Sequence, residues 1–356
     1  NYYDLLYIKL LLYAIIIEKS ANEIYNYHKK ENAVIYMKIV NLDACTTNPG
    51  DLSWDFLKKY SDDIMIYDRT QASDVIERAK GAEILVINKT VITADMIDAL
   101  SPELKYICLQ STGYNVVDID AARNKGISVC NIPSYSTNAV AQEVFAFILH
   151  FSNQTDLHSD SVHNGDWCSC PDFCYWKAPL FELDGKTIGI IGFGSIGKKV
   201  AHIAESFGMN VLFNSRSAKD TSDFKTAKQV DIEFLLKNSD FVSCHCPLTD
   251  KTTNLINKAT LNKMKKSAIL INTSRGPVVD EQALADALNS DVIAGAALDV
   301  LKEEPANPSN PLLKAKNCVI TPHIAWAAKE TRQRLLDILD KNIQSCVNGN
   351  PQNKVN

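Results

Sequence analysis

The sequence predicts an α/β protein built from two doubly wound parallel sheets that are covered by helices. Short apolar runs alternate with amphipathic helical patterns along most of the chain. The length of 356 residues suggests two domains, and one apolar run ends in three closely spaced glycines that open a helix. Apolar residues make up 46% of the chain, which is ample for a large core. The formal net charge of −5 leaves no basic stripe, so nucleic acid is not an expected partner.

The segment 1–36 differs in composition from the rest, because it is rich in Tyr, Ile, Leu, Asn and Lys. Its apolar part, 5–17, is interrupted by Lys9 and is too short to span a membrane. It also lacks the basic start of a signal peptide, so we expect no membrane association. We expect 1–36 to be a non-native or disordered extension and Met37 to be the natural start. The intact mass of the natively expressed protein would test this expectation.

Residues 37–138 are expected to form the first domain, in which apolar runs alternate with helical patterns. Such alternation favours a parallel sheet covered by helices. A helix over 136–150 that is apolar almost all round leads into the second domain, 139–325. A final amphipathic helix at about 328–346 is expected to return to the first domain, so that 326–356 completes it. The predicted strands of the first domain are 38–42, 63–67, 83–87, 105–109 and 127–130.

The second domain begins with a strand at 187–191, which leads into a G-x-G-x-x-G turn and an amphipathic helix. This order of elements is the setting of the dinucleotide-binding fingerprint, so we predict a Rossmann domain. Gly192 allows the tight turn, Gly194 lets the backbone approach a pyrophosphate, and Gly197 lets the helix pack on the sheet. The helix N-terminus adds free N–H groups for phosphates. The expected pyrophosphate contacts are Gly192, Gly194, Ser195, Ile196 and Gly197, and the six predicted strands are 187–191, 210–214, 240–244, 267–272, 293–298 and 317–320.

The choice of cofactor depends on the end of the second strand of this domain. An NAD site usually carries a carboxylate there, which holds the ribose diol. This chain has Ser215 and Arg216 instead, with no Asp or Glu. A carboxylate would repel a 2′-phosphate, whereas a hydroxyl and a guanidinium can bind one. The sequence therefore predicts NAD(P)H as cofactor and favours NADPH.

The ten cysteines are scattered without a disulfide framework, which favours a reduced, cytoplasmic protein. Cys168, Cys170 and Cys174 lack the paired C-x-x-C spacing of a zinc site, so no metal is expected. The stretch 164–183 outside any clear element holds several aromatic residues, for which we expect packing or a subunit contact. These are Trp167, Phe173, Tyr175 and Trp176.

Polar residues follow three of the predicted strands of the second domain. Arg275 follows 267–272, Asp299 follows 293–298, and His323 follows 317–320. Ligands of open α/β sheets gather at the carboxyl ends of the strands.

From Met37 onward the chain resembles the D-isomer-specific 2-hydroxyacid dehydrogenases. Within it, 172–176 and 182–187 most resemble the glycerate dehydrogenase (hydroxypyruvate reductase) branch. The matching motifs lie at 111–115, 192–197, 246–249, 272–276, 298–300, 304–305 and 321–323.

The resemblance implies a role for each matching polar residue. Arg275 would hold the substrate carboxylate and polarise its keto oxygen. His323 would be the general acid that protonates this oxygen, and the base in the reverse direction. Glu304, preferred over the adjacent Glu303 because a proline follows it, would fix the imidazole tautomer. Asp299 would orient the nicotinamide carboxamide.

The resemblance also implies further contacts and the form of the domains. The first domain would be flavodoxin-like and bind the substrate, with the Rossmann domain inserted in it. Backbone N–H groups of its turn at 111–113 would bind the substrate carboxylate. The expected substrate-binding residues are Asn88, Lys89, Ser111, Thr112, Gly113 and Arg275, and the further cofactor-binding residues are Cys246, Pro247, Thr252, Thr273, Ser274, Asp299 and His323.

The resemblance implies the NAD(P)H-dependent reduction of a small 2-keto acid, hydroxypyruvate or glyoxylate, to the D-2-hydroxy acid. Two alternatives stay open at this point. The same fold serves D-lactate and phosphoglycerate dehydrogenases, and related co-repressors use it as a cofactor-sensing binding protein. The complete set of Arg275, Glu304 and His323 favours an enzyme. A homodimer that pairs through the apolar helix at 140–149 is also implied.

Overall fold

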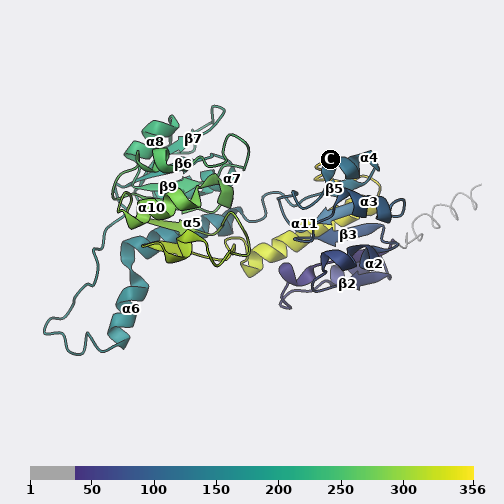
Figure 1. Ribbon diagram of the computed structural model, residues 1–356, viewed down its shortest axis with the longest axis horizontal. Helices are drawn as coiled ribbons and strands as arrows, with labels where there is room; N and C mark the ends of the chain where they lie inside the picture. The colour runs from purple at the N-terminus through teal and green to yellow at the C-terminus, as the bar shows by residue number, and fades with distance from the viewer. Residues whose placement is uncertain (1–36) are drawn as a thin grey trace, which may run out of the picture. The chain divides into compact units, whose positions relative to one another are not determined.

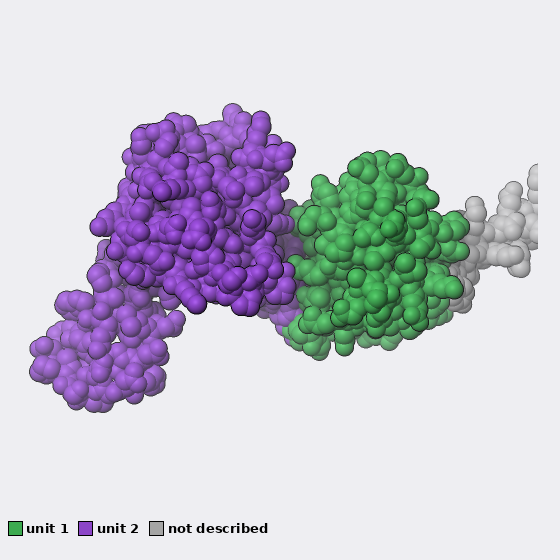
Figure 2. All heavy atoms as spheres, viewed as in Figure 1, with its two compact units in different colours: residues 1–133, 333–356 green, residues 134–332 purple. Residues whose placement is uncertain are grey.

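The computed structural model describes residues 37–356, and they divide into two compact units, which Figure 2 shows in two colours. In the described part, unit 1 comprises 37–133 together with 333–356, and unit 2 comprises 134–332. The expected extension, 1–36, lies outside the described residues. None of the helices within 37–356 is both long enough and apolar enough to cross a bilayer.

Unit 1 contains a five-stranded parallel sheet, and its five predicted strands are confirmed (Figure 1). The strand order is β2-β1-β3-β4-β5, which is the flavodoxin-like order. The chain therefore winds in one direction from β1 to β2 and in the other from β3 onward. The loops after β1 and β3 diverge at this switch point, which is where such sheets bind ligands. The strands are β1 (Ile39–Asn41), β2 (Ile64–Ile66), β3 (Ile84–Ile87), β4 (Tyr106–Leu109) and β5 (Ser128–Cys130).

Helices of unit 1 bury apolar residues in the core of the unit. The C-terminal helix α11 (Lys329–Val347) shows the spacing, since Leu335, Leu339 and Ile343 recur every four residues and are fully buried. Asp118 caps α4 (Ile119–Asn124) by accepting a hydrogen bond from Ala121 N at 2.9 Å. The other helical segments are η1 (Ala44–Thr46), η2 (Asp55–Lys59), η3 (Ala72–Asp74), α2 (Val75–Ala79) and α3 (Ala94–Leu100).

Unit 2 contains a parallel sheet of seven strands in the order β12-β11-β10-β9-β6-β7-β8. This is the Rossmann order, and its switch point lies between β6 and β9. The six predicted strands are present, but the predicted number is wrong, because β8 (Lys228–Gln229) extends the edge beside β7. Two exposed polar residues form no apolar run, so only pairing with a neighbour reveals this strand. The others are β6 (Thr187–Ile191), β7 (Asn210–Asn214), β9 (Phe241–Cys244), β10 (Ile269–Asn272), β11 (Gly295–Leu298) and β12 (Cys318–Ile320).

Two apolar clusters form the core of unit 2 on the strands of this sheet. In one of them α5 (Thr137–Asn153) packs on α7 (Ser195–Ser206), and the rings of Phe145 and Phe207 stack with centroids 5.4 Å apart. Another helix, α6 (Thr155–His163), was not predicted, since its mostly polar sequence has no apolar period. In Figure 1, α6 and the loop after it extend away from the sheet of unit 2. The remaining segments are α8 (Ile232–Asn238), α9 (Lys258–Leu261), η4 (Gly276–Val278), α10 (Glu281–Asn289) and η5 (Pro311–Lys314).

Candidate active site

The glycine turn after β6 is built by three different constraints. Gly192 has a φ of +98°, and a Cβ there would lie 2.7 Å from backbone atoms of His245 and Cys246. A Cβ on Gly197 would lie 2.3 Å from Gly192 O, so the helix α7 packs directly on the turn. At Gly194, in contrast, no heavy atom lies within 4 Å of the Cβ position. Because no side chain caps α7, its first N–H groups, at Ser195 and Ile196, fit a phosphate anion.

The end of β7 carries no carboxylate. Arg216 is exposed and forms no hydrogen bond or ion pair with any described residue. The Gln229 amide holds the turn, because its Nε2 donates to Ser215 O at 3.0 Å and to Ser217 O at 3.2 Å. The turn is thus held by the side chain of Gln229, and the Arg216 guanidinium is available to an anion.

The loops after β9 and β10 hold the remaining expected cofactor residues. Thr252 closes one loop, since its hydroxyl donates to Pro247 O at 2.7 Å. Burial raises the pKa of the Cys246 thiol, which stays protonated near neutral pH. Thr273 is 9% exposed, and its buried Oγ1 has no partner among the described residues. Such an orphaned hydroxyl is costly to bury and fits a ligand contact.

His245 lies beside the glycine turn as a half-buried residue, and its ring Nδ1 is buried without a partner among the described residues. Its Nε2 lies 2.8 Å from Ser243 Oγ, and its backbone N–H donates to Ile191 O at 2.7 Å. Burial lowers the pKa of His245 to about 4, so the ring is neutral at physiological pH. It supports the turn as a neutral group and carries no charge to the site.

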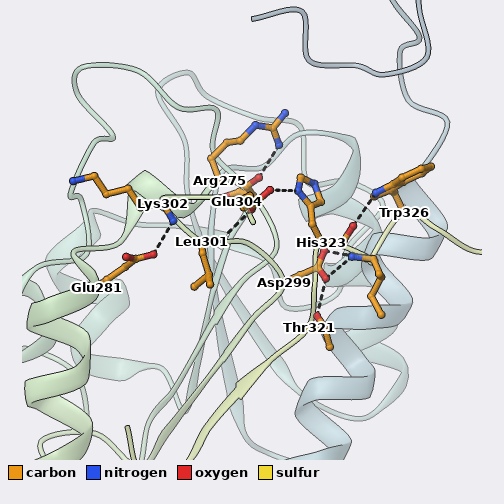
Figure 3. A network of polar contacts seen from close by, with 12 residues as sticks. Arg275, Glu281, Asp299, Leu301, Lys302, Glu304, Thr321, His323 and Trp326 are labelled. Carbon is orange, nitrogen blue, oxygen red and sulfur yellow. Dashed lines mark hydrogen bonds and ion pairs between the residues drawn. The ribbon is translucent and has the colours of Figure 1, made fainter. Parts of the chain in front are cut away.

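An imidazole and a carboxylate meet at the carboxyl ends of β11 and β12 (Figure 3). His323 Nδ1 lies 2.7 Å from Glu304 Oε2, and Leu301 N donates to Glu304 Oε1 at 3.0 Å. Glu303 points elsewhere and accepts a hydrogen bond from Asn307 Nδ2 at 3.3 Å. An ionised Glu304 accepts the proton on Nδ1, which leaves Nε2 of His323 as the nitrogen that can exchange a proton.

The backbone at His323 is held in an unusual conformation. Its φ of +55° is left-handed, which a residue with a Cβ adopts at a cost of about 1–3 kcal/mol. Asp299, 1% exposed, holds the loop by accepting hydrogen bonds from Thr321 Oγ1 at 2.7 Å, Ile324 N at 2.7 Å and Ala325 N at 2.9 Å. These bonds tie the loop after β12 to the end of its neighbour β11, and they fix the imidazole.

Arg275 stands on a loop that is equally constrained. The buried Asn272 donates from Nδ2 to Arg275 O at 2.9 Å and accepts from Ser274 N at 3.0 Å. Gly276 has no room for a Cβ, which would lie 1.9 Å from the carbonyl carbon of Leu301. The Arg275 loop therefore packs against the loop that carries Glu304. Figure 3 shows the guanidinium, exposed to solvent, above the same strand ends as the imidazole.

Sequence reasoning missed two residues near this group. Burial raises the pKa of Tyr135, and the charge of Arg275 opposes that rise. Its ring lies edge-on to Trp326, with centroids 6.4 Å apart. Burial raises the pKa of Glu143 on α5, and the negative charge of Asp299 raises it further. A single carboxylate in a mostly apolar helix was the available sign for Glu143, whereas nothing local marks Tyr135.

The expected substrate residues of unit 1 follow two neighbouring strands, so the structure brings them together at one edge of its sheet. Asn88 is 4% exposed, and its Nδ2 donates to Thr46 Oγ1 at 3.0 Å inside the unit. Lys89 is exposed. Thr112 uses its hydroxyl to bond Ile132 O at 2.6 Å. The Thr112 and Gly113 N–H groups have no acceptor among the described residues. Arg275, Glu304 and His323 belong to unit 2.

Comparison with known proteins shows which family this chain is similar to. Residues 145–325 match the family described as D-isomer specific 2-hydroxyacid dehydrogenase, NAD binding domain. The chain is 44% identical to a hydroxypyruvate reductase of Blautia hydrogenotrophica over 90% of this chain and 100% of the relative. It is 41% identical to a glycerate dehydrogenase of Methylorubrum extorquens over 89% of this chain and 98% of the relative. Among solved structures, an acyclic imino acid reductase in complex with NADPH and D-Arg is 33% identical, with a TM-score of 0.78 over 90% of this chain and 100% of that one.

Proposed function

The chain belongs to the D-isomer-specific 2-hydroxyacid dehydrogenase family, and we propose that its substrate is hydroxypyruvate or glyoxylate, which it reduces to the D-2-hydroxy acid. It is an oxidoreductase that uses a nicotinamide cofactor and acts on small 2-keto acids. The names of the two relatives, a hydroxypyruvate reductase and a glycerate dehydrogenase, support the choice of substrate. The observation that carries the proposal is the 2.7 Å contact between His323 and Glu304, together with the packing of the Glu304 loop against the Arg275 loop.

His323 is proposed to move the proton of the reaction. The nicotinamide, when bound, supplies the hydride that reduces the carbonyl carbon. As negative charge develops on the keto oxygen, the imidazolium gives it the proton from Nε2. The Nδ1 proton stays on the ring, hydrogen-bonded to Glu304. In the reverse direction neutral Nε2 takes the hydroxyl proton. Glu304 fixes the tautomer and the ring orientation through the 2.7 Å bond.

Arg275 is proposed to bind the substrate carboxylate and to polarise the keto oxygen. A guanidinium offers a planar pair of donors that matches a carboxylate, and Asn272 holds the backbone from which it projects. Within unit 1, Lys89 and the N–H groups of Thr112 and Gly113 are proposed to suit an anionic group such as a carboxylate. Asn88 is proposed to support this loop from inside, since its amide donates to Thr46.

Unit 2 is proposed to hold NADPH in preference to NADH. Gly194 leaves open space where a pyrophosphate would approach the first N–H groups of α7. Thr273 offers a buried hydroxyl without a partner among the described residues. Arg216 stands at the end of β7, where a carboxylate would exclude a 2′-phosphate. Asp299 is proposed to meet the nicotinamide carboxamide as well as to hold the His323 loop.

The proposed function is tested with a panel of 2-keto acids against both reduced cofactors. We expect hydroxypyruvate and glyoxylate, with NADPH, to give the highest kcat/KM, followed through the loss of the absorbance of reduced nicotinamide. Pyruvate, a phosphorylated hydroxypyruvate and branched 2-keto acids complete the panel. Turnover that is fastest with one of these would redirect the substrate assignment. No turnover with any acid would contradict an enzyme function and favour a cofactor-sensing binding protein.

The proposed assembly is a homodimer. The helix α5, which the sequence suggested as the pairing element, already buries Val144, Phe147 and Ile148 inside unit 2. Large aromatic side chains are exposed instead on the loop after α6, where Phe173 is 89% and Trp176 70% exposed. Aromatic side chains that are this exposed are typical of a surface that another protein chain covers. A second copy of the chain is proposed to cover them.

The proposed location is a reducing compartment such as the cytoplasm. All ten cysteines lie within the described residues and are free thiols. Free thiols in this number are typical of proteins kept under reducing conditions.

A further inference from the structure

A buried carboxylate, Asp43, stands at the switch point of the sheet in unit 1. It follows β1 and is 3% exposed. The strands β1 and β3 are neighbours at which the winding direction reverses, so the loops after them border the ligand-binding end of the sheet. Neither the motifs of the sequence nor the function proposed above uses this residue.

Asp43 gathers the backbone of the loop that follows β3. Its Oδ1 accepts a hydrogen bond from Asn88 N at 2.8 Å. Its Oδ2 accepts from Lys89 N at 2.6 Å and from Thr90 N at 2.8 Å, and the Thr90 hydroxyl donates to the same oxygen at 3.0 Å. Four donors compensate the charge of this buried carboxylate. Three successive N–H groups that converge on one side chain leave the loop a single shape.

The loop presents one charge to solvent. The Asn88 amide points inward and donates to Thr46 and Thr47, and Thr90 is buried. Lys89 alone of the three is exposed, and its ammonium has no hydrogen bond or ion pair within the described chain. Asp43 thus fixes the backbone from which a free cation projects.

The same network reaches the next loop of the sheet. Asp43 N donates to Asn41 Oδ1 at 3.3 Å, and Gln110 Nε2 donates to that oxygen at 3.2 Å. Asn41 and Gln110 are both fully buried. Gln110 directly precedes Ser111 in the turn whose N–H groups lack acceptors. One chain of hydrogen bonds therefore joins the ends of β1, β3 and β4.

We propose that Asp43 is the positioning residue of the loop after β3 in unit 1, and that it places Lys89 to bind the carboxylate of the 2-keto acid. This inference rests on the proposed function. A carboxylate suits the task because it can accept all four donors, whereas the amide of an asparagine would turn a donor toward some of them. Loss of the Asp43 carboxylate makes the loop after β3 mobile. The Lys89 ammonium then lies at the substrate carboxylate for a smaller fraction of the time.

The test uses the full chain and three variants: Asp43→Asn, Lys89→Met and the double variant. Steady-state kinetics are measured with hydroxypyruvate, glyoxylate and pyruvate, and NADPH affinity is measured separately by fluorescence titration. Each single variant is expected to raise KM for every acid about tenfold, a modest loss of binding energy, with kcat and NADPH affinity nearly unchanged. Because Asp43 acts through Lys89, KM of the double variant should not exceed that of the worse single variant.

Two further variants keep the test decisive. Asp118→Asn weakens a helix cap in the same unit, so it should lower thermal stability and leave KM unchanged. Thr90→Val removes only the hydroxyl bond to Asp43, and it should raise KM about threefold even if Asp43→Asn fails to fold. An unchanged KM in Asp43→Asn or Thr90→Val, or a double variant in which the two effects multiply, overturns the inference. A wild type that reduces no 2-keto acid overturns the proposed function instead.

Discussion

His323 combines a strained, left-handed backbone with a side chain that is hydrogen-bonded to Glu304. The left-handed φ is maintained because Asp299 accepts three hydrogen bonds from the flanking residues. Asp43 performs a comparable task in unit 1, where it binds three successive N–H groups. In both cases a buried carboxylate after one strand shapes the loop after the neighbouring strand.

Replacing His323 by Ala should remove the proton donor and leave the glycine turn and the other cofactor residues in place. General acid catalysis of this kind contributes about 100- to 10,000-fold, so kcat should fall by that order while NADPH affinity stays the same. Single-turnover rates and a fluorescence titration measure the two quantities. His163→Ala, an exposed histidine at the end of α6, serves as the control. Wild-type turnover in His323→Ala would remove this residue from the mechanism.

His245 predicts how stability changes with acid. Its pKa is about 4 in the folded protein against 6.5 ordinarily, so below pH 6.5 the unfolded chain binds a proton that the folded chain refuses. Stability should therefore fall as the pH drops from about 6.5 to about 4, by up to ~3 kcal/mol, and then level off. Denaturant unfolding at pH 7 and pH 5 measures this. In His245→Asn the loss over that interval should be smaller, and an equal loss would exclude His245 as its source.

The strand–turn–helix element of unit 2 separates two effects of adding a methyl group. In Gly194→Ala the new Cβ meets no atom of the protein and φ is negative, so stability should not change. The same Cβ would crowd a pyrophosphate and weaken NADPH binding at least about tenfold. In Gly197→Ala the Cβ lies 2.3 Å from Gly192 O, and we expect a loss of about 1–3 kcal/mol of stability. Thermal unfolding and NADPH titration of both variants measure the two effects. Normal NADPH binding by Gly194→Ala would contradict the prediction.

The end of β7 decides between the two cofactors. Ser215→Asp places a carboxylate where a 2′-phosphate would bind, and it should raise KM for NADPH about tenfold or more while KM for NADH falls. Arg216→Ala should weaken NADPH alone, because NADH has no charge at that position. Initial rates with each cofactor measure the ratio. If Ser215→Asp leaves that ratio unchanged, the cofactor is selected elsewhere.

Elements that repeat a pattern were predictable, and elements defined by their neighbours were not. The strands of unit 1 are short apolar runs bounded by polar residues, and all five lie where the sequence predicts them. The strand β8 has two exposed polar residues, and α6 is mostly polar, so neither leaves a local pattern. Among residues near the site, Arg275, Glu304 and His323 lie in local motifs. Asp43 and Tyr135 gain their surroundings only through packing between distant segments.

At the scale of the whole molecule, the exposed rings after α6 predict the oligomeric state. Phe173→Asp combined with Trp176→Asp should convert a homodimer into a monomer, because charges replace the apolar surface that a second copy would cover. Light scattering after gel filtration measures the mass. Val91→Asp, a half-exposed position in unit 1, is the control and should leave the mass unchanged. A monomeric wild type would contradict the proposed assembly.

Unit 1 is completed by residues that lie at the far end of the sequence. Val355 N donates to Val129 O at 2.9 Å, and Val129 N donates to Asn356 Oδ1 at 2.9 Å, so the final residues extend the edge at β5. A ribosome makes the strands of unit 1 early, translates all of unit 2, and only then delivers α11 and these closing residues. Nascent unit 2 can fold as soon as it has been translated. Until α11 follows, the five strands of unit 1 keep an apolar face exposed. Chaperone capture of the growing chain is therefore expected to be strongest on the first unit and to end only after α11 and residues 355–356 have been translated.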